Sequence, residues 1–167
     1  IFVRQLLPVR ASFDALDPKD RVGPILTDVK ASGVMLSDVW VETADSPDGE
    51  QLRAFARSFE SAMATALKRE KRFDARSMHR LHLFAHSGTQ IDVSIATHAE
   101  TAPWKGGIPR LRFPSDAPSR STLKLEEAFL VLLDDDERGR WLQPGMTAVD
   151  LGACPGGWTY QFARRSI

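Results

Sequence analysis

One short segment combines residue types that could hold a small charged ligand. An apolar run leads into an acid and then a glycine-rich loop, Val149-Asp150-Leu151-Gly152-Ala153-Cys154-Pro155-Gly156-Gly157-Trp158-Thr159. Glycines let a backbone approach a ligand closely, and a following helix offers free N–H groups. Because the Asp150 carboxylate would repel a pyrophosphate, it favours a cationic or zwitterionic ligand such as an ammonium or a sulfonium. The alternative is a tight strand-to-helix turn that binds nothing.

Two other nucleotide-binding motifs are excluded by the residues of this loop. The dinucleotide fingerprint requires G-x-G-x-x-G, and Ala153-Cys154 interrupts that pattern. The P-loop requires Gly-Lys followed by Ser or Thr, whereas Gly157 is followed by Trp158-Thr159. The loop is therefore of neither phosphate-binding type.

The elements around this loop are those of an α/β fold. Residues 146–151 are apolar on both faces and predict a buried strand. A helix is expected over 158–165, and an earlier helix over 121–133 with one apolar face. A strand, a glycine loop and a helix in this order form the start of a nucleotide-type α/β domain.

Residues 150–158 resemble motif I of the S-adenosylmethionine-dependent, FtsJ-like ribose 2′-O-methyltransferases. Upstream, a second stretch resembles that family's Ser-Arg-x-x-x-Lys-Leu-x-Glu segment: Ser119-Arg120-Ser121-Thr122-Leu123-Lys124-Leu125-Glu126-Glu127-Ala128. Residues 107–129 and 148–161 are similar to bacterial 23S rRNA cytidine 2′-O-methyltransferases, which carry a THUMP RNA-binding region before the methyltransferase domain. The strong resemblance covers roughly the last third of the chain.

The resemblance implies roles for individual residues. Lys124 would be the first lysine of a Lys-Asp-Lys-Glu catalytic tetrad, and S-adenosyl-L-methionine would be the cofactor. The residues implied to contact that cofactor are Ser121, Asp150, Cys154, Pro155, Gly156 and Gly157. Plainer alternatives are a surface lysine paired with Glu127, a serine that caps a helix, and a loop that is only a turn. Cys154 is interpreted as a small loop residue, because the cysteine of cytosine-C5 methyltransferases lies in later motifs.

The first hundred residues alternate between strand and helix patterns. We expect helices over 18–32 and 50–73, the first with Asp17 as its N-cap and Gly33 just after its end. Strands are expected over 1–7, 38–43, 78–85 and 90–97, and the last two flank a hairpin at Ser87-Gly88. This order predicts an α+β layer with helices covering a sheet.

The predicted fold class is an α+β THUMP-like region followed by the start of a Rossmann-like α/β methyltransferase domain, incomplete in this chain. The predicted boundaries are 1–101 for the RNA-binding region and 121–167 for the N-terminal part of the methyltransferase domain. A linker rich in proline, glycine and arginine is expected over 102–120.

Composition narrows the class of protein. The 167 residues carry 22 basic and 22 acidic side chains, and they include one cysteine. No apolar run is long enough to cross a membrane, and a single cysteine rules out a disulfide framework. A reducing compartment, the cytoplasm, is therefore expected.

Of the four histidines, His82 and His86 would lie about 13 Å apart along one strand, too far to share a zinc ion. We expect surface or hairpin histidines and no metal.

The neutral net charge conceals charged blocks. Residues 53–82 contain eight basic and three acidic side chains. That block is interpreted equally well as an RNA-phosphate contact or as a solvated helix face. Trp104 and Phe113 lie in the arginine-rich linker and favour stacking on RNA bases. The expected partner is 23S rRNA.

The expected function is S-adenosylmethionine-dependent 2′-O-methylation of a cytidine in 23S rRNA. Both ends of the chain look cut, and the later tetrad residues are absent, so the 167-residue chain is expected to be inactive by itself. The alternatives are a non-catalytic THUMP-type RNA-binding module and a methyltransferase that acts on an RNA base. The target nucleotide and the oligomeric state are not predicted.

Overall fold

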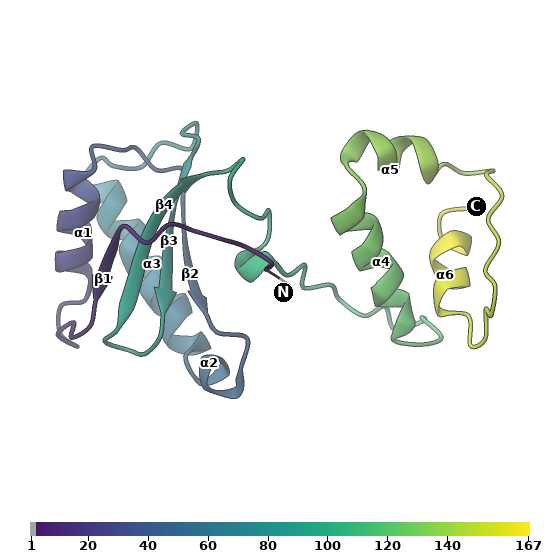
Figure 1. The fold of residues 1–167 in the computed structure, drawn as a ribbon, viewed down its shortest axis with the longest axis horizontal. Helices are drawn as coiled ribbons and strands as arrows, with labels where there is room; N and C mark the ends of the chain where they lie inside the picture. The colour runs from purple at the N-terminus through teal and green to yellow at the C-terminus, as the bar shows by residue number, and fades with distance from the viewer. Residues whose placement is uncertain (1–2) are drawn as a thin grey trace. The chain divides into compact units, whose positions relative to one another are not determined.

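Two compact units make up the protein, Ile1–Ile108 and Pro109–Ile167. The computed structural model describes residues 3–167, and Figure 1 draws the elements of both units. The boundary between the units lies inside the irregular stretch 102–120. The first unit is called unit 1 below and the second unit 2.

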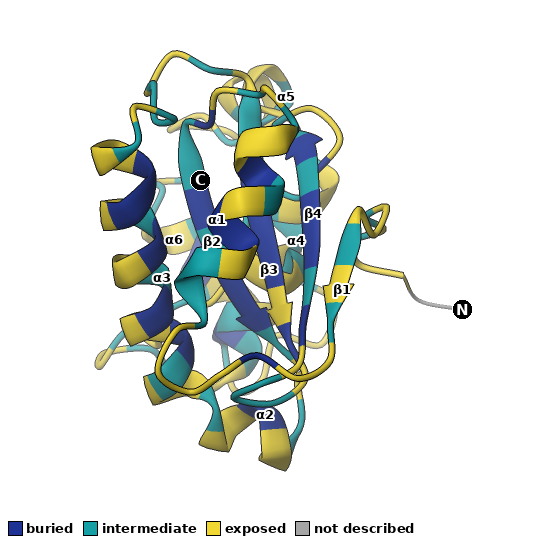
Figure 2. Cartoon of the chain, turned by 90° about the vertical axis from the view of Figure 1, so that its left-hand side faces the viewer, coloured by how far each residue is buried: buried dark blue, intermediate teal, exposed yellow. Residues whose placement is uncertain are grey.

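Unit 1 is a mixed α/β structure built on a four-stranded sheet with the strand order β1-β4-β3-β2. Strand β2 runs parallel to β3, and the other pairs are antiparallel. Helices α1 and α3 cover one face of the sheet, as Figure 2 shows. The bounds of the elements are β1 (Ala11–Phe13), α1 (Val22–Ala31), β2 (Asp38–Thr43), α2 (Pro47–Gln51), α3 (Arg53–Arg69), β3 (His79–Ala85) and β4 (Ile91–Thr97).

The core of unit 1 lies between that sheet and those two helices. Leu81, Leu83 and Val93 point to the same side of the central strands and are fully buried. Met63 and Leu67 face them from α3 at helical spacing and are also fully buried. Burial of each such side chain contributes about 1.5–3 kcal/mol to the free energy of folding. These apolar contacts hold α3 against the sheet.

Strand and hairpin predictions in unit 1 are largely confirmed. β2 has the predicted bounds, 38–43, and β3 and β4 are each one residue shorter than expected at their first end. β3 and β4 pair antiparallel around the predicted turn at Ser87-Gly88. The predicted strand over 1–7 is wrong for the residues that the structure describes, because no strand covers residues 3–7. The first strand is β1 instead, which pairs with β4.

Both predicted helices of unit 1 exist with changed bounds. α1 begins at Val22, not at residue 18, and the carboxylate that accepts from an N–H of its first turn belongs to Asp20, not to Asp17. Pro24 lies in that first turn, where no N–H is needed within the helix. Gly33 follows the C-cap, as predicted.

The helix predicted over 50–73 is divided. A short helix, α2, begins after Ser46, whose side chain accepts from the N–H of Gly49, and α3 then begins at Arg53. α3 ends at Arg69, because Lys71 takes a positive φ of 56° that no continuing helix allows. A further short turn of 3₁₀ helix, η1 (Lys105–Gly107), stands in the stretch expected to be irregular.

Unit 2 contains three helices, and no strand is present among its residues. α4 (Ser121–Leu132) agrees with the predicted helix to one residue. α5 (Asp135–Trp141) was not predicted, and it begins with a capping box between Asp134 and Glu137. α6 (Gly157–Ala163) starts one residue before its predicted beginning.

The buried strand predicted over 146–151 is wrong. No strand is assigned to these residues, and the side chains of Val149 and Leu151 are 77% and 92% exposed. A strand needs a neighbouring strand that accepts and donates its backbone hydrogen bonds. Unit 2 supplies none, so the apolar run forms no ladder.

Candidate functional site

The glycine loop between residues 151 and 157 has backbone N–H groups that are free to bind a ligand. Gly152 and Gly156 have φ values of 92° and 95°, a region that strongly favours glycine. In the described chain, the N–H groups of residues 152–154 make no backbone hydrogen bond, and Leu151 to Pro155 are all exposed. These donors and this exposure fit a ligand that the loop would hold through its backbone.

Helix α6 starts in close contact with the first turn of α4. A Cβ added to Gly157 would overlap the Ser121 Oγ and would lie 2.6 Å from the Ser119 Oγ. The two serine hydroxyls are 2.5 Å apart. Further along, the Gln161 amide donates to the Thr122 carbonyl at 2.9 Å, and both residues are fully buried. The start of α6 can therefore approach the first turn of α4 this closely only because Gly157 has no side chain.

Ser121 and Lys124 lie one turn apart on α4, so the lysine stands next to the turn that contacts the loop. Ser121 does not cap α4 with its side chain, which removes one of the plainer alternatives. Lys124 is exposed and forms no ion pair with any described residue, so the predicted alternative of a pair with Glu127 is not found. Its ammonium is therefore free for another partner.

Asp150 is held at the start of α6. The hydroxyl of Thr159 donates to its Oδ2 at 2.7 Å, which leaves Oδ1 without a protein donor in the described structure. Cys154 is exposed and is a free thiol. The structure brings Ser121 to Gly157, and it places Asp150 beside Thr159 of the same helix.

An ion pair between Arg165 and Glu126, to which sequence reasoning gave no role, links the end of α6 to α4. Arg165 donates to the Glu126 carboxylate at 2.6 Å and to the Gln161 Oε1 at 2.5 Å. Its guanidinium also lies 5.2 Å from the Phe129 ring centroid. Arg165 lies just beyond the end of α6, and its spacing of four from Gln161 was the only signal for this pairing.

The aromatic and basic residues proposed for RNA are divided between the units. Trp104 belongs to unit 1 and Phe113 to unit 2. Phe113 lines a shallow cavity of about 380 Å³ together with Arg112 and Arg164. Beside it, the Tyr160 hydroxyl donates to Asp116 at 2.9 Å, and this hydrogen bond raises the pKa of Tyr160. From the basic block, exposed side chains on α3 are Arg53, Arg57, Lys68 and Arg69.

Of the expected surface or hairpin histidines, His82 lies in the β3–β4 hairpin but is not at the surface. Its side chain is 1% exposed, and its Nδ1 lies 2.9 Å from the Glu42 Oε2. His86 is exposed and pairs with Asp92 at 2.8 Å. Across the described residues, no group of three acidic, histidine or cysteine side chains is arranged to hold a metal. Nor does any of the described helices have the length and apolar character needed to cross a membrane.

Replacing Gly157 by alanine is expected to destabilise unit 2 by about 1–3 kcal/mol. The added methyl group overlaps the Ser121 Oγ and stands 3.0 Å from the Thr122 backbone nitrogen, so α6 must move away from α4. Urea unfolding followed by tryptophan fluorescence, together with amide exchange of α4 and α6, measures the change.

Gly139→Ala is the matched control for this substitution. Gly139 is also helical, but nothing lies within 4 Å of an added Cβ. Alanine there is expected to leave unit 2 unchanged or slightly more stable. Equal stability of both variants would contradict the close packing at Gly157.

Two family profiles match this chain. Residues 20–96 match the profile described as "Ribosomal RNA large subunit methyltransferase M, N-terminal", and residues 117–166 match "FtsJ-like methyltransferase". The second match includes both the Ser119–Ala128 segment and the glycine loop. It confirms the resemblance that was inferred from those two motifs.

Relatives match over the whole chain. Proteins named "Ribosomal RNA large subunit methyltransferase M" are 45% identical in Stenotrophomonas maltophilia (strain K279a), 43% in Xanthomonas campestris pv. campestris (strain B100) and 44% in Azoarcus sp. (strain BH72). Each alignment covers 100% of this chain and 48%, 49% and 46% of the respective relative. The chain thus spans about half the length of the curated relatives that it matches.

Proposed function

We propose that this chain supplies the cofactor loop and the first catalytic lysine of an S-adenosylmethionine-dependent rRNA methyltransferase, one that modifies the 2′-hydroxyl of a cytidine in 23S rRNA. The proposal rests first on the relatives, which are named ribosomal RNA large subunit methyltransferase M. The sugar position and the cofactor come from the FtsJ-like motifs quoted above. The cytidine comes from the resemblance of residues 107–129 and 148–161 to 23S rRNA cytidine 2′-O-methyltransferases.

The observation that carries this proposal is the packing of Gly157 on the first turn of α4. It places the loop implied to bind the cofactor against the helix that carries Lys124. A methyl transfer needs the donor and the attacking hydroxyl to be held together, and this orientation supplies a large share of the rate. A turn with no ligand would not need two motifs joined in this way.

In this proposal each residue of the site has a distinct task. The backbone of Cys154, Pro155, Gly156 and Gly157 would hold the methionine part of the cofactor, and Ser121 and Asp150 would also contact it. The bound cofactor supplies a methyl group on a sulfonium. Lys124 would orient the 2′-hydroxyl of the substrate ribose and, as a cation, would favour loss of its proton.

Unit 1 is assigned to RNA in the same proposal, as a THUMP-like region. The profile match over residues 20–96 and the exposed basic side chains of α3 support this assignment. Unit 2 would belong to a Rossmann-like methyltransferase domain. The substrate of such an enzyme is made and assembled in the cytoplasm, which is the proposed compartment.

Calorimetric titration of S-adenosylmethionine into the protein that contains this chain tests the assignment. We expect binding, and we expect Asp150→Asn to weaken it about tenfold, because a carboxylate beside a cationic ligand is lost. Asp136→Asn is the control, since Asp136 is exposed on α5 and no ligand role is proposed for it.

The outcomes separate the competing functions. Binding that Asp136→Asn preserves and Asp150→Asn weakens supports the methyltransferase. If the unsubstituted protein binds no cofactor, the proposal fails and a non-catalytic RNA-binding module takes its place. Methyl transfer that appears on the base in nucleoside analysis of the product would overturn the ribose assignment alone.

A further inference from the structure

The sheet of unit 1 has a second face that the helices do not cover. Alternation along the strands places the core residues on one side and Trp40, Glu42, His82 and Ser94 on the other. The chain segment 3–9 passes over this second face, and η1 lies beside β2 (Figure 1). A sheet that helices cover on one face can leave its other face to water, yet Glu42, His82 and Ser94 are buried on this one.

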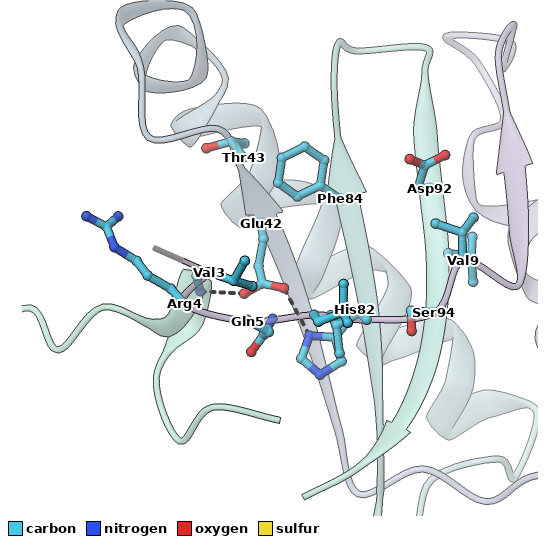
Figure 3. A pocket seen from close by; sticks show the side chains of 14 residues that line it. Val3, Arg4, Gln5, Val9, Glu42, Thr43, His82, Phe84, Asp92 and Ser94 are labelled. Atoms are coloured by element: carbon cyan, nitrogen blue, oxygen red, sulfur yellow. Dashed lines mark hydrogen bonds and ion pairs between the residues drawn. The ribbon is translucent and has the colours of Figure 1, made fainter. Parts of the chain in front are cut away.

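A cavity of about 600 Å³ lies on that face, within unit 1 (Figure 3). The strands β2, β3 and β4 form its floor, and residues 3–9 with Gly106 form its rim. Apolar side chains such as Leu6 and Phe84 line it beside the polar ones. Cavities of this volume hold small organic ligands in many proteins.

The Glu42 carboxylate fixes the histidine ring in the floor of this cavity. The Glu42 Oε2 lies 2.9 Å from the His82 Nδ1, and Oε1 accepts from the Gly106 N–H at 2.5 Å. Burial raises the pKa of Glu42, but the hydrogen bonds from His82 and Gly106 outweigh it, so the pKa is lowered. The ionised carboxylate only accepts, so Nδ1 donates, and in the neutral ring Nε2 becomes an acceptor.

Two buried polar atoms in the same floor have no protein partner. The His82 Nε2 and the Ser94 Oγ make no hydrogen bond with any described residue, although the residues are 1% and 5% exposed. His82 and Ser94 are directly paired on β3 and β4, and both line the cavity. Buried polar atoms in native proteins nearly always have a partner. Both atoms are closed to solvent in this arrangement, so a ligand with an N–H group next to an acceptor would satisfy them once the rim of the cavity moves aside.

The charge of the cavity favours an uncharged ligand. Two carboxylates line it, Glu42 and Asp92, and the cation at its rim, Arg4, is already bonded to Asp45 at 3.2 Å. A phosphate inside would therefore be repelled. A flat heterocycle with donors and acceptors on one edge matches the paired polar atoms, and its face matches the aromatic ring of Phe84.

We propose that this cavity binds a single unpaired nucleobase, which donates an N–H to the His82 Nε2 and accepts from the Ser94 hydroxyl. The source of the base is the RNA substrate if the function proposed above holds, and the inference rests on that function for the source alone. A base within a duplex is excluded, because its hydrogen-bonding edge is occupied by its partner.

Titration of the 167-residue chain with RNA tests this site. The probes are a single-stranded oligonucleotide of mixed sequence, the same strand annealed to its complement, and the four free nucleosides. We expect the single strand to bind at least about tenfold more tightly than the duplex. The ¹⁵N resonance of the His82 Nε2 should shift when either the single strand or a nucleoside binds.

Ser94→Ala is the decisive variant. It removes a hydroxyl that has no partner in the protein, so the fold should be unaffected. Binding of the single strand should weaken about tenfold, because one hydrogen bond to the base is lost. Ser58→Ala is the control, since the Ser58 hydroxyl is exposed on α3 and bonds only to the Phe55 carbonyl.

Each result decides something. Unchanged affinity in Ser94→Ala, equal binding of duplex and single strand, or a His82 resonance that does not move would overturn the site. Nucleosides that bind as tightly as the single strand would support the site and assign it to a free nucleoside. Because the cofactor titration concerns unit 2, its failure together with success here would remove the proposed function and leave the nucleobase site.

Discussion

Methyl transfer by the protein that contains this chain is expected to fall about a hundredfold to ten-thousandfold when Lys124 is replaced by methionine. Positioned groups that assist proton loss contribute factors of this size. Lys124 is exposed and has no ion-pair partner among the described residues, so methionine, which keeps an apolar stem, breaks no ion pair of the fold. The turnover number and the affinity for S-adenosylmethionine should be measured together.

The two measurements distinguish a catalytic lysine from a structural one. We expect the turnover number to fall while cofactor affinity and unfolding free energy remain near those of the unsubstituted protein. Arg140→Met is the control, because Arg140 is an exposed cation on α5 away from both motifs. An equal loss of cofactor affinity and turnover in Lys124→Met would refute the assigned role.

Unit 1 is expected to lose about 3 kcal/mol of unfolding free energy at neutral pH when Glu42 is replaced by alanine. Removal of a buried carboxylate leaves the groups that donate hydrogen bonds to it without an acceptor. Here both the His82 Nδ1 and the Gly106 N–H would lose their acceptor. Urea unfolding of the chain measures the loss.

The pH dependence of that loss has a definite sign. The pKa of Glu42 is lowered in the folded protein, so its stabilisation is fully present above the pKa of the unfolded chain. It disappears as the pH falls through the lowered folded pKa. The unfolding free energies of Glu42→Ala and the unsubstituted protein should therefore converge in acid.

Glu100→Ala is the control for Glu42→Ala. Hydrogen bonds from Thr97 also lower the pKa of Glu100, but this carboxylate is at the surface. The groups that it leaves can bind water, so the change at neutral pH should be much smaller. A difference for Glu42→Ala that stays constant into acid would show that its charge contributes nothing.

Strands β2, β3 and β4 of unit 1 could be predicted because their pattern is local, whereas β1 was not predicted. Residues 38–43 alternate in polarity, and that period alone places Val39 and Val41 in the core. The run 146–151 carries an equally clear apolar signal, yet Val149 is exposed. Whether an apolar run becomes a strand depends on a neighbour elsewhere in the chain, and its own residues do not contain that information.

Some candidate functional residues could likewise be identified from the sequence, and others could not. The motif identified Lys124 and the loop by resemblance, while the pairing of Glu42 with His82 escaped prediction. These residues are 40 positions apart and meet only because β2 lies parallel to β3. The signal that was available is that Trp40 and Glu42 share the face opposite to Val39 and Val41.

The contact between Gly157 and Ser121 couples substitutions in the glycine loop to substitutions in the first turn of α4. A Cβ at 157 meets the hydroxyls of both Ser121 and Ser119, so substitutions at these three positions are not independent of one another. The two segments are far apart in the sequence, but each limits the size of the side chains that the other can carry. Grafting the loop onto another scaffold would therefore fail unless the first turn of α4 travelled with it.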